Sequence, residues 1–437
     1  MPTTIFLPIL TRARELDSRL MLAARLCRDG HVCYMGLTRT LTAIARETRP
    51  SIYLQPILNT GSEGRLREMR GLGHWILGWD EEGLVYPSGA WYRDDRVGSG
   101  TLDSIDLFVT WGARQRRDLG ELERSGDRNG PRIVNIGNPR ADMLRAPYRA
   151  AVDAQAAELR ERLGRFVLIN TNFDLVNHLD GGAVFQRRLR DSGYFAEAGG
   201  AARLRRWAEY RRFMLTTFLA GIPGFLRLIG DRTVVLRPHP SEDPAPWRDL
   251  ADCYPQLRIE PAAGSVLPWL AAADALIHNS CTTAVEAFAL GTPVIAIHPP
   301  GLDRIAESPL PNALSHRVPD WAEAARLVTG GGIERSAEQE RLLASHIADF
   351  PRQDCIETLG RLCAGAARRL APPGRVDPAA WARDDIGMIT KRRDENSRLP
   401  PFDDAAMAEA ERVLVTSPHG PARLERVHDH VIAVSPA

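Results

Sequence analysis

Lysine is nearly absent from this chain of 437 residues: Lys391 is the only one, and every other basic residue is arginine. A Schiff-base enzyme, a P-loop phosphate binder and a protein kinase each need a lysine at a defined place in the active site. Because Lys391 lies in an irregular charged stretch near the end, these three classes are excluded. The 56 Lys+Arg residues balance 55 Asp+Glu residues, which also excludes nucleic-acid binding through bulk charge.

The sequence also lacks the usual signatures of metal and cofactor sites. Its six cysteines form no C-x-x-C pair, as is typical of reduced thiols rather than of disulfides or zinc ligands. It contains no Asp-x-Asp, His-Glu-x-x-His, Gly-x-Gly-x-x-Gly or Gly-x-Ser-x-Gly motif. We therefore expect neither a bound metal nor a cofactor.

Long apolar runs are missing as well. No stretch of 18 uncharged apolar residues occurs, and the apolar start at residues 5–10 runs directly into Arg12, Arg14 and Glu15 without a basic leader. The expected location is the cytoplasm, with at most peripheral contact at the inner face of the membrane.

The composition and the order of apolar segments predict an α/β protein. The chain is 44% hydrophobic and 25% charged, and its length exceeds what one hydrophobic core usually serves. Buried-strand candidates occur first at 4–9, 31–35, 51–54, 105–110 and 132–136, and then at 166–170, 233–236, 275–278 and 293–297. Helical patterns, such as 14–28, 201–219 and 283–290, separate them, which favours parallel sheets covered on both faces.

Two domains and a tail are expected from this pattern. The first should cover residues 1–155 and the second residues 156–365, with a cleft between them. In the tail, residues 366–437, mixed charge and many prolines indicate a linker, one helix near 404–413 and a short strand near 430–434.

The strongest local signal is ALIHNSCTTAVEAFALGTPVIAI at residues 275–297, which reads as a strand, a small polar turn, a helix and a second strand. The N–H groups of Thr282, Thr283 and Ala284 should point past the carboxyl end of the sheet, where the helix dipole favours an anion. With Asn279 and Ser280, this turn is a candidate phosphate site.

Glu286 lies about one turn further along the same helix. Its carboxylate could accept two hydrogen bonds from a ribose diol if a nucleotide occupied the crevice. In the alternative interpretation, Ser280 or Thr282 merely caps the helix and Glu286 completes a capping box with Thr283.

A second candidate element, Arg-Pro-His-Pro at 237–240, follows an apolar strand. Its two prolines hold the backbone extended, so Arg237 and His239 should emerge in fixed directions just beyond the strand end. There a histidine can donate to a phosphate oxygen, and an arginine can neutralise the phosphate without a metal. The alternative is that His239 is only a loop residue.

Five carboxylates of the first domain are candidate catalytic groups. Asp80, Glu81 and Glu82 form one acidic run; it is either an exposed turn, or one of its members projects into the cleft with a raised pKa as a base or nucleophile toward a sugar. Glu15 and Asp17 lie near the start of the first helix, where the helix dipole alone favours them.

Amide side chains are dense just after the strand at 166–170. Asn170 and Asn172, followed by Asn177 and His178, suit the recognition of hydroxyl groups, although tight turns also select asparagine. We include Asn170 and Asn172 among the candidate donor-binding residues.

In combination, several segments resemble the bacterial surface carbohydrate biosynthesis proteins, whose members are similar to glycosyltransferases of the GT-B architecture. The resemblance covers about residues 4–300 and rests on TRARELDSRL at 11–20, DEEGL at 80–84, GNPRAD at 137–142, LINTNF at 168–173 with VNH at 176–178, and RPHP at 237–240 with the Ser/Thr turn. It implies two Rossmann-like domains facing a central cleft.

The same resemblance implies transfer of a sugar from a nucleotide donor to a glycan or lipid-linked glycan of the bacterial surface. The element His-Pro followed by a Ser/Thr turn is similar to that of GT-B enzymes using CMP-activated acidic sugars, such as sialyl and Kdo transferases. On that analogy His239 and the turn would hold the donor phosphate, and the carboxylates near Asp80 would face the anomeric carbon.

Two other functions stay open. The second domain also resembles teichoic-acid polymerases, which would make the chain a CDP-alcohol phosphotransferase. Alternatively, the chain is a non-catalytic nucleotide-sugar-binding protein of the same pathway.

Overall fold

The computed structural model describes residues 2–97, 99–125, 132–191, 195, 199–261, 264–301, 307–370 and 398–437. The chain divides into two compact units, Met1–Ala151 with Ala344–Ala437, and Val152–Leu343. The structure thus differs from the expected boundary at 365, because residues 344–365 belong to the first unit. The expected linker at 371–397, with Lys391, lies outside the described residues.

The first unit contains an eight-stranded sheet in the order β13-β14-β2-β1-β3-β4-β5-β6. β1 to β6 are parallel, whereas β14 pairs antiparallel with β2 and β13 pairs antiparallel with β14. The strands are β1 Thr4–Ile9, β2 Val32–Leu37, β3 Ile52–Gln55, β4 Trp75–Gly78, β5 Leu107–Thr110, β6 Arg132–Asn135, β13 Ala422–His428 and β14 Val431–Pro436. All six residues of β1 are buried, as expected for a central parallel strand.

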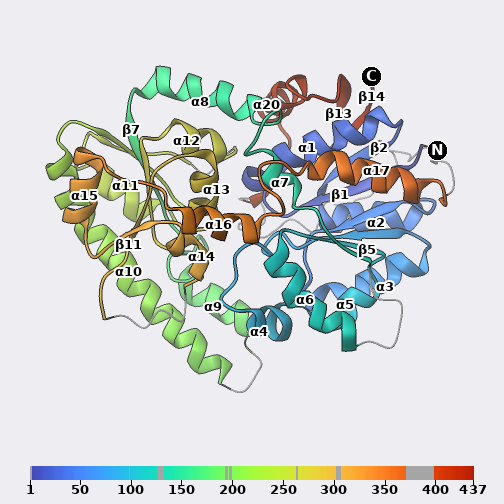
Figure 1. The fold of residues 1–437 in the computed structure, drawn as a ribbon, viewed down its shortest axis with the longest axis horizontal. Coiled ribbons are helices and arrows are strands. Elements are labelled where there is room, and N and C mark those ends of the chain that lie inside the picture. Colours follow the sequence, from blue (N-terminus) through green and yellow to red (C-terminus); the bar gives the residue numbers. More distant parts are fainter. Residues whose placement is uncertain are drawn as a thin grey trace. The chain divides into compact units, whose positions relative to one another are not determined.

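Figure 1 shows helices on this sheet, among them α1 and α17 near β1 and β2. The helices of the unit are α1 Arg12–Arg28, α2 Thr38–Glu47, α3 Glu63–Gly71, α4 Gly89–Trp91, α5 Ser99–Asp103, α6 Ala113–Ser125, α7 Pro139–Asp142, α17 Cys355–Ala367 and α20 Asp404–Val415, with short turns η1 Thr60–Ser62 and η2 Tyr92–Arg96.

The C-terminal hairpin docks closely on β2 at one glycine. Gly36 has a φ of +158°, and a Cβ at this position would lie 2.0 Å from the carbonyl oxygen of His430. Only glycine therefore allows β14 to approach β2 at this register. The tail is accordingly part of the first unit's sheet, where the sequence predicts only one short strand.

The second unit contains a six-stranded parallel sheet in the order β12-β11-β10-β7-β8-β9. Its strands are β7 Phe166–Asn170, β8 Thr233–Arg237, β9 Leu257–Ile259, β10 Ala275–His278, β11 Val294–Ile297 and β12 His316–Val318. Read from β9, the strands run 3-2-1-4-5-6, which is the Rossmann order. The predicted α/β fold with two Rossmann-like domains is thus confirmed.

Nine helices among the described residues belong to this unit or cross its boundaries. They are α8 Ala150–Leu163, α9 Gly182–Asp191, α10 Gly200–Ile229, α11 Ala245–Ala251, α12 Leu267–Ala272, α13 Thr283–Leu290, α14 Pro309–Ala313, α15 Trp321–Gly330 and α16 Ala337–His346. In Figure 1, α10 is the long green helix of this unit.

Of the described helices, α10 is the one long and apolar enough to cross a membrane, and 33% of its most apolar window is buried. One stripe of the helix, including Met214, Phe218, Ile222 and Phe225, lies in the same core cluster as side chains of β7, β8, β10 and β11. α10 therefore covers one face of the second sheet.

The crossing of α10 and α15 yields a testable prediction about packing. A Cβ at Gly221 would lie 1.9 Å from Cδ1 of Trp321, whereas a Cβ at Gly224 on the same helix would meet only the Arg227 guanidinium, at 3.9 Å. We expect G221A to lower the free energy of unfolding by roughly 1 to 3 kcal/mol because Trp321 must move.

The matched variant G224A should instead raise the free energy of unfolding by up to about 1 kcal/mol, since alanine favours the helix more than glycine does. Urea unfolding followed by circular dichroism measures both. Equal effects of the two variants would contradict this packing of α10 on α15.

Candidate functional site

The second sheet has its switch point between β7 and β10. The chain runs from β7 outward through β8 and β9, and then returns to the other side of β7 as β10. In open parallel sheets of this kind, ligands bind outside the carboxyl ends of the strands at the switch point. The residues that follow β7 and β10 therefore form the first place to look for a site.

The bend after β10 has an unusual backbone. Ser280 has a φ of +67°, a left-handed conformation that serine adopts rarely, and the Cys281 N–H donates to Nδ1 of His278 at 3.1 Å. Among the described residues, no side chain caps α13 at Thr282, and the Ser280 hydroxyl donates to the Ser308 carbonyl at 3.4 Å. The structure thus does not show the local capping interpretation of these side chains.

The three N–H groups expected to face an anion are not equivalent. The Ala284 N–H donates to the Cys281 carbonyl at 3.1 Å, and the Thr283 N–H and hydroxyl lie within hydrogen-bonding reach of the Cys281 thiol. The expectation that Ala284 contributes its N–H to a ligand is therefore wrong. Thr282 and Thr283 themselves are half-buried at the start of α13.

Two buried amides join the bend to the segment after β7. Nδ2 of Asn170 donates to Oγ1 of Thr283 at 3.1 Å, and Nδ2 of Asn279 donates to the Asn172 carbonyl at 3.3 Å. Asn170 and Asn279 are only 4% and 3% exposed. The structure thus brings together the side chains of Asn170, Asn279 and Thr283 and the backbone carbonyl of Asn172.

The side-chain oxygens of Asn170 and Asn279 are buried without a hydrogen-bond partner among the described residues. A buried unsatisfied acceptor costs roughly 1 to 3 kcal/mol, which a ligand hydroxyl or amine can offset. Arg211 lies beneath the same segments, where Nη1 donates to the carbonyls of Asn172 at 2.9 Å and Asn279 at 3.4 Å. Burial lowers the pKa of the Arg211 guanidinium.

A buried glutamate connects the segment after β8 to the segment after β7. Oε1 of Glu242 accepts from the Phe173 N–H at 2.7 Å, the Thr171 hydroxyl at 2.9 Å and the His239 N–H at 3.3 Å. Burial raises the pKa of Glu242 to about 7, although these donors act in the opposite direction. Sequence reasoning missed Glu242, which comes two residues after the Pro-His-Pro element.

His239 is half-buried, and its tautomer is set by a neighbour. Nδ1 accepts from the Ser241 N–H at 3.3 Å, so in the neutral ring the proton is on Nε2. β7 lies between β8 and β10, so the starts of the His239 segment and of the Ser/Thr bend are separated by roughly two strand spacings, about 10 Å.

Arg237 has other partners than the Ser/Thr bend. It is 4% exposed, its guanidinium donates to the carbonyls of Ser265 at 3.3 Å and Pro261 at 3.4 Å, and Cζ lies 5.0 Å from the centre of the Trp269 ring. These contacts direct its charge to the Pro261 and Ser265 carbonyls and to the Trp269 ring. Glu286 lies buried in the first turn of α13, and its charge helps to raise the pKa of the Cys281 thiol, after burial itself.

In the first unit, Asp80 and Glu81 are completely buried beyond β4, so the interpretation of this run as an exposed turn is wrong for both. Asp80 pairs bidentately with Arg96 at 2.9 and 3.2 Å and accepts from the Tyr92 hydroxyl at 3.1 Å. Glu81 pairs with Arg19 at 2.5 Å and with Arg140 at 3.5 Å.

The pKa values of Glu81 and Glu82 fall, whereas a catalytic base would need a raised pKa. Burial would raise the pKa of Glu81, but the charges of Arg19 and Arg140 lower it overall. For Glu82, which pairs with Arg14 at 2.6 Å, burial is likewise outweighed and the pKa falls to about 2.

Glu15 differs from these carboxylates. Its oxygens accept from the N–H groups of Leu10 at 2.9 Å and Thr11 at 3.2 Å, at the carboxyl end of β1. Burial and the charge of Glu81 raise its pKa. Asp17 is half-buried on α1. Among the described residues, no group of three or more His, Cys, Asp or Glu side chains could hold a metal ion.

Comparison with solved structures identifies the fold. UDP-GlcNAc 2-epimerase from Methanocaldococcus jannaschii, in complex with UDP-GlcNAc and UDP, matches with a TM-score of 0.51 and 12% identity over 83% of this chain and 99% of that chain. The wall teichoic acid polymerase TagF matches with a TM-score of 0.53 and 11% identity over 84% and 89%. Protein-family models and curated proteins gave no match. The chain therefore has the GT-B fold.

The arginine–carboxylate contacts of the first unit predict a large stability effect. We expect R19M to lower the free energy of unfolding by roughly 3 to 5 kcal/mol, because Glu81 would keep a buried charge without its principal partner. Adding E81Q should restore part of the loss.

The control R46M removes an exposed pair, Arg46 with Glu68, and should cost less than about 1 kcal/mol. Chemical denaturation measures all three variants. A loss for R19M no larger than that for R46M would show that the buried pair does not stabilise the first unit.

Proposed function

We propose that this protein is a glycosyltransferase that moves a sugar from a nucleotide donor to a bacterial surface polysaccharide or its precursor, without a metal ion. The observation that carries the proposal is the group of polar side chains that the structure brings together at the switch point of the second sheet, Asn170, Asn279 and Thr283. Two buried amide oxygens there lack a partner among the described residues, which suits the hydroxyl groups of a nucleotide sugar.

The donor phosphate would lie at the start of α13. The hydroxyls of Thr282 and Thr283 and the positive end of the helix dipole favour an anion at this position. His239 would donate from Nε2, the nitrogen that carries the proton in its neutral form. Glu286 would accept from the ribose hydroxyls, and Asn172 would contribute its amide.

These groups would stabilise the negative charge that develops on the leaving phosphate. Fixed hydrogen-bond donors need no reorganisation when the glycosidic bond breaks, and they take the place of a divalent metal. In this proposal Arg237 acts as a positioning residue, since its guanidinium donates to the backbone carbonyls of Pro261 and Ser265.

The catalytic base is assigned to the first unit. Glu15 also pairs with Arg14 and Arg19, but its pKa is raised, whereas the pKa values of Glu81 and Glu82 are lowered, so Glu15 suits the role best. Asp80 is held by its bidentate pair with Arg96. Asp17 remains a candidate. The acceptor would be a glycan or lipid-linked glycan, and the protein would act in the cytoplasm or at the inner face of the membrane.

The similarity to GT-B enzymes supports the donor class. The epimerase structure contains UDP-GlcNAc and UDP, and a TagF variant with one histidine replaced was soaked with CDPG. The second structure favours a second candidate function, transfer of a phospho-alcohol from a CDP-linked donor. The product separates the two: a glycosidic bond supports sugar transfer, and a phosphodiester supports the alternative. A CMP-activated acidic sugar remains the finer proposal for the donor.

Calorimetry against CMP, CDP, UDP and GDP in the presence of EDTA tests the proposal. We expect one nucleotide to bind, and we expect N170A, H239A and T283V each to weaken its affinity by about tenfold or more, the effect of losing one hydrogen bond to a charged or buried group. A preference for a cytidine nucleotide would support the acidic-sugar donor.

The matched control is N177A, because the Asn177 amide donates to the Asp243 carbonyl at 2.9 Å instead of to the bend. Its affinity should stay within about twofold of wild type. Binding that EDTA abolishes and magnesium restores would contradict metal independence, and failure of all four nucleotides to bind would contradict the proposed function.

A further inference from the structure

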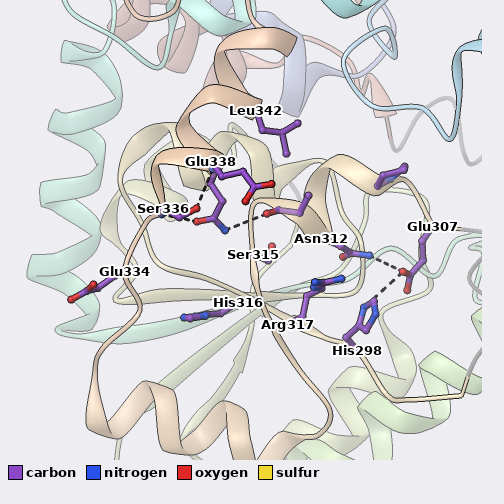
Figure 2. Close-up of a pocket in the computed structure, with 13 residues that line it drawn as sticks. His298, Glu307, Asn312, Ser315, His316, Arg317, Glu334, Ser336, Glu338 and Leu342 are labelled. Carbon is purple, nitrogen blue, oxygen red and sulfur yellow. Dashed lines mark hydrogen bonds and ion pairs between the residues drawn. The ribbon is translucent and has the colours of Figure 1, made fainter.

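A polar pocket of the second unit is lined by residues that follow β11, by α14, by the start of β12 and by the first part of α16. It has a volume of about 680 Å³, within the range of small-molecule sites, and His298, Glu307, Asn312, Ser315 and His316 contribute to its wall. Figure 2 shows these side chains with Arg317 around one hollow. None of them has a role in the nucleotide site described above.

Hydrogen bonds connect this pocket to the Ser/Thr bend. Nε2 of His278 lies 2.8 Å from Oγ of Ser315, while Nδ1 of the same ring accepts from the Cys281 N–H. Burial lowers the pKa of His278 to about 3, so the ring is neutral and its Nε2–H donates to Ser315. The Ser280 hydroxyl reaches the Ser308 carbonyl, next to α14. The pocket wall and the bend are thus held together.

Glu307 is held in the wall by several neighbours. Oε2 accepts from Nδ2 of Asn312 at 2.7 Å and lies 4.0 Å from Nδ1 of His298, and Oε1 accepts from the Tyr210 hydroxyl of α10. Burial raises the pKa of Glu307 to about 7, so near neutral pH the carboxyl group has a proton to donate. A fixed carboxyl group of this kind can both donate to and accept from a ligand hydroxyl.

The chemistry of the lining separates the possible ligands. Among the lining residues none is Phe, Tyr or Trp, so a nucleobase would find no aromatic ring on which to stack. The charge of Arg317 is opposed by Glu334 and Glu338, so a phosphate would gain little from an excess of positive charge. The lining includes both donors and acceptors, and Nε2 of His316 is buried without a partner among the described residues.

We propose that this pocket binds a sugar ring through its hydroxyl groups. A ring hydroxyl is both a donor and an acceptor, which is what a wall of carboxyl, amide, imidazole and serine groups can satisfy. The sugar would be either the one linked to the nucleotide donor or the terminal sugar of the acceptor. The inference rests on the proposed function for its choice of ligands, and its test separates the two sources.

The experiment compares ligands with and without a sugar by calorimetry. UDP is compared with UDP-GlcNAc, and CMP is compared with CMP-N-acetylneuraminate. Free N-acetylglucosamine and free N-acetylneuraminate are each titrated in the presence and in the absence of the nucleotide. The variants are E307Q, which keeps the size of the side chain, and H316F, which removes the ring nitrogens. E323Q is the matched control, because Glu323 is a partly exposed residue of α15 that pairs with Arg326 outside the pocket.

We expect both pocket variants to weaken a sugar-containing ligand by about tenfold, which corresponds to about 1.4 kcal/mol, and to leave the bare nucleotide unchanged. If only the nucleotide sugar weakens, the pocket holds the donor sugar; if only the free saccharide weakens, it holds the acceptor. Thermal unfolding shows whether each variant is folded. If one of E307Q and H316F is not folded, the binding measurements on the other variant test the inference.

The inference fails if saccharide-containing ligands bind the pocket variants and E323Q with equal affinity, or if no saccharide, free or nucleotide-linked, binds more tightly than the nucleotide alone. If the pocket variants and E323Q bind saccharide-containing ligands equally well but the nucleotides still bind, only the inference about the pocket fails and the proposed function stands. If the nucleotides do not bind but a free saccharide does and E307Q weakens it, the proposed function fails and the pocket remains a sugar site.

Discussion

Burial of amide oxygens at the carboxyl ends of β7 and β10 is the constraint on which this interpretation of the molecule depends. Asn170 and Asn279 direct their N–H groups into the protein, to Thr283 and to the Asn172 carbonyl, and leave their oxygens without a partner. Buried acceptors are usually satisfied by protein groups, ordered water or a ligand, so these two oxygens suit a ligand that brings hydrogen-bond donors. The parallel topology brings them to the switch point, where GT-B and other Rossmann-like folds bind ligands.

The surrounding groups hold the residues that follow β7, β8 and β10 in one arrangement. Glu242 connects the segments after β7 and β8, and His278 connects the Ser/Thr bend to Ser315. Each is buried, and each has its hydrogen bonds directed to backbone N–H groups or to a hydroxyl. Their common effect is to fix the positions of Thr282, Thr283 and His239 before a ligand arrives, which is what electrostatic stabilisation of a leaving group requires.

Part of this organisation could be predicted from the sequence. The continuous apolar runs that became β7, β8, β10 and β11 predicted a parallel sheet, and polar residues directly after a strand necessarily collect at one edge. β4 escaped prediction because Trp75–Gly78 is short and flanked by glycine, and β13 because Ala422–His428 is largely polar and exposed.

The remainder depends on partners that are distant in the chain. Nothing adjacent to Asp80 and Glu81 in the sequence indicates that they form buried ion pairs with Arg96, Arg19 and Arg140. The sequence therefore offered only an exposed turn or a catalytic base for these two residues. Arg237 likewise has distant partners, since its orientation depends on Trp269 and on the carbonyls of Pro261 and Ser265. Glu242 and Glu307 also went unnoticed, since their raised pKa values arise from burial that only the fold creates.

A crystal structure of the protein with its preferred nucleotide tests the central claim most directly. The account predicts a phosphate within hydrogen-bonding distance of Thr282 and Thr283, and ligand donors within about 3 Å of the side-chain oxygens of Asn170 and Asn279. A nucleotide bound away from the carboxyl ends of β7 and β10, with both amide oxygens still lacking a ligand contact, would contradict it.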